Sequence, residues 1–265
     1  MPYTEIARIT ENIEIAENTF QTKMFSPNIS AEVKPGQFIN ILPSNYWGKV
    51  MRRPMSVAGT ENEIISIIYK AVGEGTIAMK NWKVGEEVNI IGPLGNKWSG
   101  FNKTPVLIGG GVGIAPTLFL HNYLNTIVKE HYLVMGARIK DEHFIEHSPT
   151  ERVYLTTDDG SCGLSGNVLN AIDAIREKTD INKVKFFVCG PAPMMEAIRN
   201  LACKENIDCE IALETIMACG IGICQGCTME YTNEKLNSHT YRNKFGLVCM
   251  DGPVFNAKEI KTCYL

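Results

Sequence analysis

Residues 214–227 read Glu-Thr-Ile-Met-Ala-Cys-Gly-Ile-Gly-Ile-Cys-Gln-Gly-Cys, and residues 247–253 read Leu-Val-Cys-Met-Asp-Gly-Pro. These two segments contain four cysteines, Cys219, Cys224, Cys227 and Cys249. The first three have the spacing C-x4-C-x2-C, which is typical of the ligands of a 2Fe–2S cluster. One tight loop supplies three thiolates, and a separate segment supplies the fourth, so that each iron obtains tetrahedral sulfur ligation. The spacing therefore predicts an iron–sulfur centre, with these four cysteines as the metal ligands.

Other sites with four cysteines must be weighed against the cluster. Structural zinc is usually held by two separate C-x2–4-C pairs, whereas here the C-x4-C and C-x2-C spacings share Cys224. Disulfides or simple thiols are a third alternative. Gly220, Gly222 and Gly226 lie between the ligands and allow the backbone N–H groups to approach and donate to sulfur. The spacing favours the cluster, and the two alternatives remain open at this point.

The composition limits the class of protein. The chain has 265 residues, a length typical of about two domains. Its formal net charge of −3 lacks the basic character of a nucleic-acid-binding protein. The sequence has no apolar run of about 18 residues and no apolar signal core near Met1, so we expect no membrane segment. Nine cysteines, an odd number with four in a cluster pattern, indicate a reducing compartment and a cytoplasmic location.

The first hundred residues have the rhythm of an antiparallel β-barrel. Short apolar, β-branched segments alternate with turn signals such as Lys34-Pro35-Gly36. The expected strands are Ile6–Ile9, Ile13–Ala16, Thr19–Met24, Gln37–Leu42, Ile64–Tyr69 and Glu87–Ile91.

After Phe101 the chain alternates strands with helices, which predicts βαβ units and a parallel sheet. The expected strands are Val106–Ile108, Tyr132–Met135, Val153–Thr156 and Lys185–Cys189, and the expected helices are Thr117–Val128, Leu169–Glu177 and Ala192–Glu205. The prediction is thus a multidomain fold with α+β and α/β parts. It consists of a β-barrel domain at residues 1–100, a parallel-sheet α/β domain at 101–213 and a small cluster module at 214–265.

Two motifs in the barrel are candidates for one phosphate site. Residues 51–57 place Arg52 and Arg53 next to each other before a proline, and guanidinium groups bind phosphate in a bidentate manner. Residues 73–76, Gly-Glu-Gly-Thr, open an expected helix over residues 76–81, whose N–H groups can face a pyrophosphate. Each motif alone is also consistent with a surface turn. Together, ahead of a nucleotide domain, they predict two halves of one dinucleotide site.

In the α/β part, Gly109–Pro116 reads Gly-Gly-Gly-Val-Gly-Ile-Ala-Pro between a strand and a helix. Such a turn lets the backbone approach a pyrophosphate at a helix N-terminus, and we predict that Gly110, Gly111 and Gly113 take part. The motif differs from the usual G-x-G-x-x-G pattern. A tight strand–helix connection with no ligand is therefore the alternative.

Two further strand ends carry candidate residues for the same nucleotide. Cys189-Gly190-Pro191 follows a strand, and ligands of open α/β sheets bind at the carboxyl ends of strands, so a nicotinamide ring is expected there. The alternative for Cys189 is a small buried packing residue. Asp158, in Thr157-Asp158-Asp159-Gly160, suits a ribose diol and repels a 2′-phosphate, which favours NAD over NADP.

These motifs, taken together, resemble those of the ferredoxin–NADP reductase superfamily. The resemblance is carried by Arg53–Ser56, Gly75-Thr76, Gly109–Pro116 and Cys189–Pro191. The order of barrel, nucleotide domain and C-terminal 2Fe–2S module narrows it. The tail, with Cys219–Cys227 and then Cys249-x-Asp-Gly-Pro-Val-Phe, resembles the electron-transfer subunits of bacterial type B dihydroorotate dehydrogenases. The resemblance covers nearly the whole chain.

The resemblance implies an FAD site in the barrel. In it, Arg53 would contact the phosphates, and Ser56 would lie near the flavin ring. Many members of the superfamily have Tyr or Phe at the position of Met55, so this chain lacks one stacking partner. The implied site residues are Arg53, Pro54, Met55, Ser56, Ile68, Tyr69, Lys70, Gly75 and Thr76.

The resemblance also implies the function and the partner. Electrons would pass from the FMN of a separate catalytic subunit through the 2Fe–2S cluster and FAD to NAD+, in pyrimidine biosynthesis. Two copies of each subunit would form a heterotetramer, and this chain would need no acid–base catalytic residue. Two alternatives are considered: an equivalent subunit of a ferredoxin:NADP oxidoreductase, a sulfite reductase or a hydrogenase, and a redox sensor without turnover.

Overall fold

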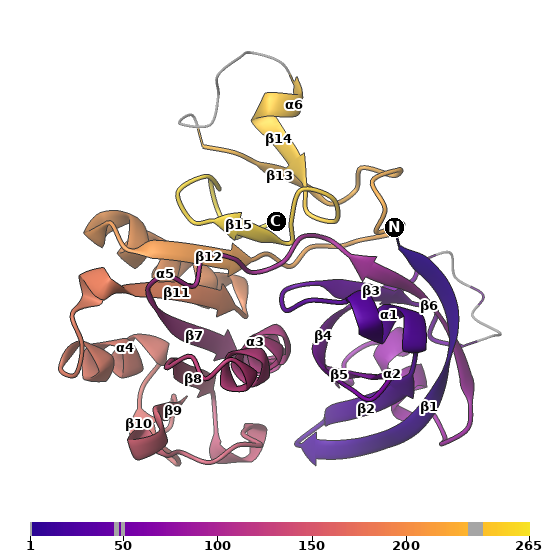
Figure 1. Cartoon of the computed structure of the whole chain (residues 1–265), viewed down its shortest axis with the longest axis horizontal. Helices are drawn as coiled ribbons and strands as arrows, with labels where there is room; N and C mark the ends of the chain where they lie inside the picture. The colour runs from indigo at the N-terminus through magenta and orange to yellow at the C-terminus, as the bar shows by residue number, and fades with distance from the viewer. Residues whose placement is uncertain (1, 45–47, 49–50, 233–240) are drawn as a thin grey trace.

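The computed structural model describes residues 2–44, 48, 51–232 and 241–265. A β-barrel and an α/β domain lie side by side, and the C-terminal segment crosses the top of both in the view of Figure 1. The predicted fold class is confirmed: an antiparallel barrel is followed by a mainly parallel sheet with helices and then by a small cysteine-rich segment. None of the described helices is both long enough and apolar enough to cross a membrane.

The barrel closes in the strand order β1-β2-β5-β4-β3-β6. Its strands are β1 (Tyr3–Ala16), β2 (Thr19–Phe25), β3 (Phe38–Ile41), β4 (Arg53–Glu61), β5 (Ile64–Lys70) and β6 (Glu87–Leu94), with the short helices α1 (Pro27–Glu32) and α2 (Glu74–Lys80). The two strands expected before residue 17 are one strand with register shifts. Strand β4 was missed because its first residues, Arg53 to Ser56, lack the apolar pattern of a strand.

The α/β domain has a seven-stranded sheet in the order β10-β9-β8-β7-β11-β12-β15. Its strands are β7 (Thr104–Gly110), β8 (Tyr132–Ala137), β9 (Val153–Thr157), β10 (Leu164–Ser165), β11 (Val184–Cys189), β12 (Asp208–Ala212) and β15 (Val254–Asn256). The helices are α3 (Ile114–Thr126), α4 (Val168–Arg176) and α5 (Ala192–Glu205), with 3-10 turns at Gly111–Gly113, Lys140–Glu142, Pro149–Glu151 and Ile181–Lys183. The buried hydrophobic runs of β7, β8 and β11 are typical of parallel strands covered on both faces.

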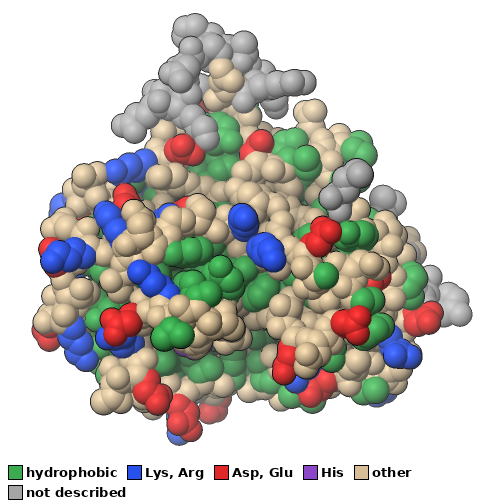
Figure 2. Space-filling view, in the orientation of Figure 1, with side chains coloured by type: hydrophobic (Ala, Val, Ile, Leu, Met, Phe, Trp, Pro, Cys, Tyr) green, Lys and Arg blue, Asp and Glu red, His purple; other side chains and the backbone are tan. Residues whose placement is uncertain are grey.

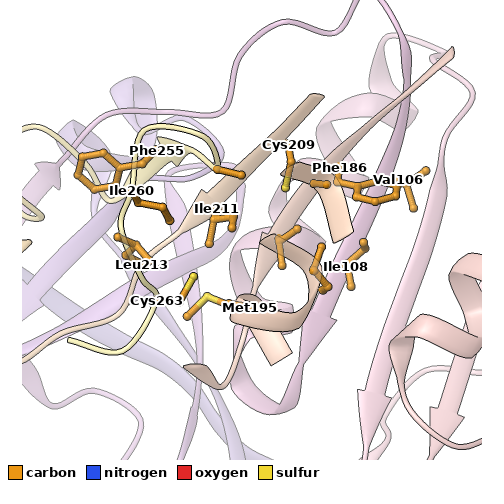
Figure 3. Packing of buried hydrophobic residues seen from close by; sticks show 14 of the residues in the cluster. Val106, Ile108, Phe186, Met195, Cys209, Ile211, Leu213, Phe255, Ile260 and Cys263 are labelled. Atoms are coloured by element: carbon orange, nitrogen blue, oxygen red, sulfur yellow. The ribbon is translucent and has the colours of Figure 1, made fainter. Parts of the chain in front are cut away.

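The C-terminal segment is built onto this sheet. It contains a two-stranded sheet of β13 (Thr228–Glu230) and β14 (Phe245–Leu247), a helix α6 (Tyr241–Lys244), and β15, which pairs antiparallel with β12. Figure 3 shows Phe255, Ile260 and Cys263 beside Ile211 and Met195 in one buried cluster. The cysteine-rich segment therefore shares its core with the α/β domain.

Candidate cofactor sites

A cavity of about 290 Å³ lies between the barrel and the C-terminal segment. From the barrel it is lined by residues of β4, β5 and α2, and these include seven predicted FAD residues: Pro54, Met55, Ser56, Ile68, Tyr69, Lys70 and Thr76. From the C-terminal side it is lined by Leu213, Glu214, Thr215, Met217 and Pro253. Figure 2 shows hydrophobic side chains gathered in the middle of this face of the molecule, with Lys and Arg side chains beside them.

The two neighbouring arginines have different surroundings. Arg53 packs against the start of α2, because a Cβ added at Gly75 would lie 2.5 Å from Arg53 Nε. Arg52 instead donates to Asn89, at 2.6 Å to Oδ1 and 3.1 Å to the carbonyl oxygen, and so braces β3 and β6. Of the two arginines, Arg53 is therefore the one that lies next to the predicted phosphate-binding helix. Its close packing requires a glycine at position 75.

Tyr69 borders the cavity, but its hydroxyl points into the barrel. The phenol oxygen lies 3.3 Å from Asn12 Oδ1 and 3.4 Å from Thr22 Oγ1. Burial raises the pKa of Tyr69 to about 12, although the hydrogen bond with Thr22 acts in the opposite direction. Asn12 also donates to the carbonyl oxygens of Met79 and Lys80 at the end of α2. This network fixes α2 to the barrel wall and leaves the Tyr69 hydroxyl neutral.

A second cavity, of about 390 Å³, opens at the carboxyl edge of the parallel sheet. Five predicted nucleotide residues line it: Gly110, Gly111, Gly113, Asp158 and Gly190. The two loops at its floor touch, since a Cβ at Gly113 would collide with the carbonyl group of Cys189. At Gly111, with φ of 53°, no atom lies within 4 Å of an added Cβ. Gly113 thus allows the two loops to pack closely, and Gly111 leaves the backbone open toward the cavity.

An ion-pair network joins the two cavities. Glu142, with 8% of its side chain exposed, lies 2.7 Å from Lys70 Nζ and 2.6 Å from an Arg138 terminal nitrogen. The hydrogen bond from Arg138 lowers the pKa of Glu142 to about 2; burial opposes this, and Lys70 adds to it. Lys70 belongs to the barrel, whereas Glu142 belongs to the α/β domain. Glu142 belongs to no recognisable sequence motif. Its contact with Lys70 becomes visible only in the folded structure.

Cys189 contacts the carboxyl group of Glu214, a residue that the sequence analysis did not identify. Its thiol lies 3.7 Å from Glu214 Oε1, because β11 and β12 are neighbouring parallel strands and each residue stands at or just beyond a carboxyl end. Burial raises the pKa of both groups, and Glu214 lines both cavities. Cys189 itself is 1% exposed and does not line either cavity. A carboxyl group with a raised pKa therefore lies where the two cavities meet.

The four predicted iron ligands come together in two pairs. The thiols of Cys227 and Cys249 are 3.2 Å apart, and the Cys224 N–H donates to Cys219 Sγ at 3.4 Å. Among the described residues, no three His, Cys, Asp or Glu side chains converge on a point suitable for one metal ion. None of these cysteines forms a disulfide in the described chain. Paired soft thiolates fit two irons with two ligands each better than one zinc ion surrounded by all four sulfurs.

The loop that carries Cys219 and Cys224 also lowers the pKa of the Cys219 thiol. Burial raises the pKa of Cys219, but hydrogen bonds from the N–H groups of Cys224 and Ile221 outweigh it and lower the pKa to about 7. Gly220 and Gly222, with φ of 71° and 81°, supply the left-handed turns that aim these N–H groups. A metal ligand must be a thiolate, so a lowered pKa favours ligation.

Comparisons with known proteins agree with this arrangement. The profile of the iron–sulfur cluster binding domain of dihydroorotate dehydrogenase B matches residues 214–261, and that of an oxidoreductase NAD-binding domain matches residues 107–200. The electron transfer subunits of dihydroorotate dehydrogenase B (NAD(+)) from Fusobacterium nucleatum and Caldanaerobacter subterraneus are 33% and 37% identical to the chain. They match 97% and 96% of it, and 98% and 97% of their own length.

A solved structure extends the likeness to three dimensions. A chain of the NADH-dependent reduced ferredoxin–NADP oxidoreductase, described in connection with flavin-based electron bifurcation, has a TM-score of 0.83 and 28% identity. The match covers 99% of this chain and 92% of that one. An oxidoreductase with NAD, FAD and an iron–sulfur cluster is therefore confirmed as the class of protein. On the evidence of its full-length relatives, the chain belongs to the family of the electron transfer subunits of dihydroorotate dehydrogenase B.

Proposed function

We propose that this chain carries electrons between the FMN of a separate dihydroorotate-oxidising subunit and NAD+, in pyrimidine biosynthesis in the cytoplasm. A flavin exchanges both one and two electrons, so FAD in this chain can link a one-electron iron–sulfur centre to hydride exchange with NAD. A (β/α)8 barrel that oxidises the substrate needs about 250 residues of its own. The described residues instead form an antiparallel barrel, a seven-stranded sheet and a two-stranded sheet, which supports a separate partner subunit for that step.

One observation carries the proposal: the three candidate sites are contiguous. The nucleotide cavity and the flavin cavity share Lys70, Val112 and Glu214. The flavin cavity in turn is lined by Met217 and Pro253. These residues stand two positions before Cys219 and four positions after Cys249. A nucleotide, a flavin and a cluster bound in these places would lie in the order that the transfer needs.

The proposed residue roles follow from position. Arg53, Gly75 and Thr76 hold the FAD pyrophosphate, while Ser56 and Met55 lie at the flavin ring. Ile68, Tyr69 and Lys70 line the flavin from β5. For the nucleotide, Gly110, Gly111 and Gly113 would hold the pyrophosphate, and Gly190, with the buried Cys189 beneath it, would support the nicotinamide. The metal ligands are Cys219, Cys224, Cys227 and Cys249.

Glu214 adds a group that can hold a proton between the two cavities. Burial raises the pKa of Glu214 and so favours its protonated form, and a protonated carboxyl group can donate a hydrogen bond where a carboxylate only accepts. This role concerns binding and orientation and needs no chemistry on an organic substrate.

A second candidate is the electron-transfer subunit of a ferredoxin–NADP oxidoreductase. The structural match to such a protein over 99% of the chain favours it. The partner separates the two candidates, since the first needs an FMN-containing subunit that oxidises dihydroorotate and the second does not; the nucleotide does not separate them, because the matched oxidoreductase is itself NADH-dependent.

We expect NADH to reduce the flavin faster than NADPH. Asp158 lines the nucleotide cavity, and the cationic Arg138 beside it is engaged by Glu142, so a 2′-phosphate would meet a carboxylate and no uncommitted guanidinium. The replacement Asp158→Ser should lower the ratio of the NADH rate to the NADPH rate by about tenfold, the equivalent of about 1.4 kcal/mol. Both rates of flavin reduction are measured by stopped flow.

Asp159→Ser is the matched control. The Asp159 carboxylate accepts from Ser161 N and Oγ at 2.9 and 2.6 Å and is not among the lining residues of the cavity. The ratio should stay as in the wild type. A wild-type protein that NADPH reduces as fast as NADH would contradict the assignment to NAD.

The division of labour has a direct test. The purified chain, loaded with FAD and iron, should pass electrons from NADH to an artificial dye and should not oxidise dihydroorotate. Adding an FMN-containing dihydroorotate dehydrogenase barrel subunit should restore NAD+-dependent oxidation, in a complex with two copies of each chain. Bleaching of the flavin of the isolated chain by dihydroorotate would refute the proposal.

A further inference from the structure

Asn40 is a buried amide in an otherwise apolar strand. All four residues of β3 are buried, and the Asn40 side chain has no exposed surface. On the neighbouring strand its partner in the register is Pro54, one of the residues that line the flavin cavity. A buried amide is unfavourable unless its hydrogen bonds are made, so its contacts indicate why the strand keeps it.

The Asn40 amide contacts the first ligand loop. Its Nδ2 donates to the carbonyl oxygen of Cys219 at 3.1 Å. The next residue must be a glycine, because a Cβ at Gly220 would lie 2.7 Å from the same nitrogen. The carbonyl group fixes the orientation of the amide, since the reverse orientation would set two oxygens against each other. Asn40 Oδ1 is buried without a hydrogen-bond partner among the described residues.

An unpaired buried oxygen argues against a purely stabilising role. A side chain kept for stability alone would satisfy both ends of the amide or be replaced by an apolar residue of similar size. What Asn40 does provide is one directed bond to the residue that carries a thiol. Arg52 holds the strand from behind, with a contact of 3.4 Å to the Asn40 carbonyl oxygen.

Asn96 makes the equivalent contact with the second ligand segment. It follows β6 in the barrel, and its Nδ2 donates to the carbonyl oxygens of Val254 and Asp251 at 2.7 and 3.0 Å. Its Oδ1 accepts from Val254 N at 2.9 Å, and its own N–H donates to the carbonyl oxygen of Gly252 at 2.6 Å. Cys249 stands two residues before this clasped stretch.

We propose that Asn40 and Asn96 are positioning residues for the iron–sulfur centre. Each holds one of its two thiol-bearing segments on the flavin barrel, Asn40 through Cys219 and Asn96 through the stretch after Cys249. The barrel that lines the flavin cavity thereby sets the place and the backbone geometry of both ligand pairs. The inference rests on the proposed cluster and extends it to side chains outside the cysteine motif.

The test compares Asn40→Leu and Asn96→Leu with the wild type, all loaded with iron, sulfide and FAD. Loss of a group that orients a metal ligand typically weakens a site by about 10- to 100-fold. We therefore expect iron release to a chelator to be at least about tenfold faster, and the electron paramagnetic resonance spectrum of the reduced cluster to be altered. The FAD content should be unchanged.

Thr22→Val is the matched control, because it also removes a buried barrel hydrogen bond. Thr22 is fully buried and donates to Asn12 Oδ1 at 2.7 Å, within the network that fixes α2. It should lower the thermal midpoint, as the asparagine replacements do, and leave iron release and the resonance spectrum as in the wild type. This comparison separates positioning of the cluster from a general loss of stability.

If Asn40→Leu does not fold, Asn40→Asp, which keeps the shape and replaces the Nδ2 donor by oxygen, is measured in the same way. Wild-type iron release and an unaltered spectrum in the asparagine variants would overturn the inference. A change in Thr22→Val as large as in Asn40→Leu would overturn it as well. A wild-type chain that takes up no iron would instead refute the proposed cluster itself.

Discussion

Replacing any one of Cys219, Cys224, Cys227 and Cys249 by serine is expected to leave the chain almost without iron. A serine hydroxyl is a hard, weakly acidic donor in place of a soft thiolate, and each iron has only two protein ligands. Iron and acid-labile sulfide per chain should fall by about tenfold or more relative to the wild type. The visible absorption and the resonance signal of the reduced cluster should fall with them.

The chain offers two matched controls for this experiment. Cys203 is exposed on α5, and Cys162 is partly buried between β9 and β10; neither belongs to the ligand pairs. Cys203→Ser and Cys162→Ser should keep full iron and sulfide. Ligand variants that each keep the wild-type content would show that the four cysteines do not hold a cluster.

The second large effect concerns the surface beside the ligand loop. Ile216 and Ile223 are 77% and 76% exposed, and Met250 is 55% exposed next to Gly222 of the same loop. Large exposed apolar side chains beside a functional loop indicate a candidate protein–protein interface. We propose that this surface, defined by Ile216, Ile223 and Met250, binds the FMN-containing subunit, because each of its residues stands within three positions of Cys219, Cys224 or Cys249 in the sequence.

Ile223→Glu should weaken the complex by about 30-fold or more, as expected for a charge placed in the centre of an apolar interface. Dihydroorotate-dependent NAD+ reduction at limiting partner concentration should fall accordingly, while NADH-dependent dye reduction stays unchanged. The affinity is read by titration and by sedimentation of the mixed subunits.

Val84→Glu is the control for this surface. Val84 is 71% exposed in the turn between α2 and β6, whereas Leu94, at the opposite end of β6, lies beside Gly220 of the ligand loop. It tests whether any exposed apolar residue matters equally. Equal losses for Val84→Glu and Ile223→Glu, or no loss for Ile223→Glu, would refute the docking surface.

Local sequence patterns were enough to predict much of the fold and to propose the ligand set. The C-x4-C-x2-C spacing is a property of one loop, and the turn at Gly109–Pro116 joins adjacent elements, so both can be read without a fold. The helix expected at Ala192–Glu205 has the observed bounds, because a proline precedes it and Asn206 in the left-handed region ends it. Such signals depend only on neighbours in the chain.

The residues that sequence reading missed are brought together by topology. Glu214 meets Cys189 only because β12 pairs with β11, and Glu142 meets Lys70 only because the two domains lie side by side. Asn40 reaches Cys219 across 179 positions of the chain. A lone carboxylate or amide has no spacing pattern, so none of these contacts can be predicted before the strand order is known.

The pairing of β15 with β12 also limits how the protein can be divided. Val254–Asn256 covers the edge of the large sheet, and Phe255 packs in its core. The iron-binding segment is therefore not an independent domain that can be removed without exposing this sheet. Cutting the chain ahead of residue 214 would uncover a strand edge and an apolar face at the same time, a combination that invites aggregation. An engineer who grafts this electron-transfer tail onto another flavin reductase must therefore transplant the last sheet strands with it.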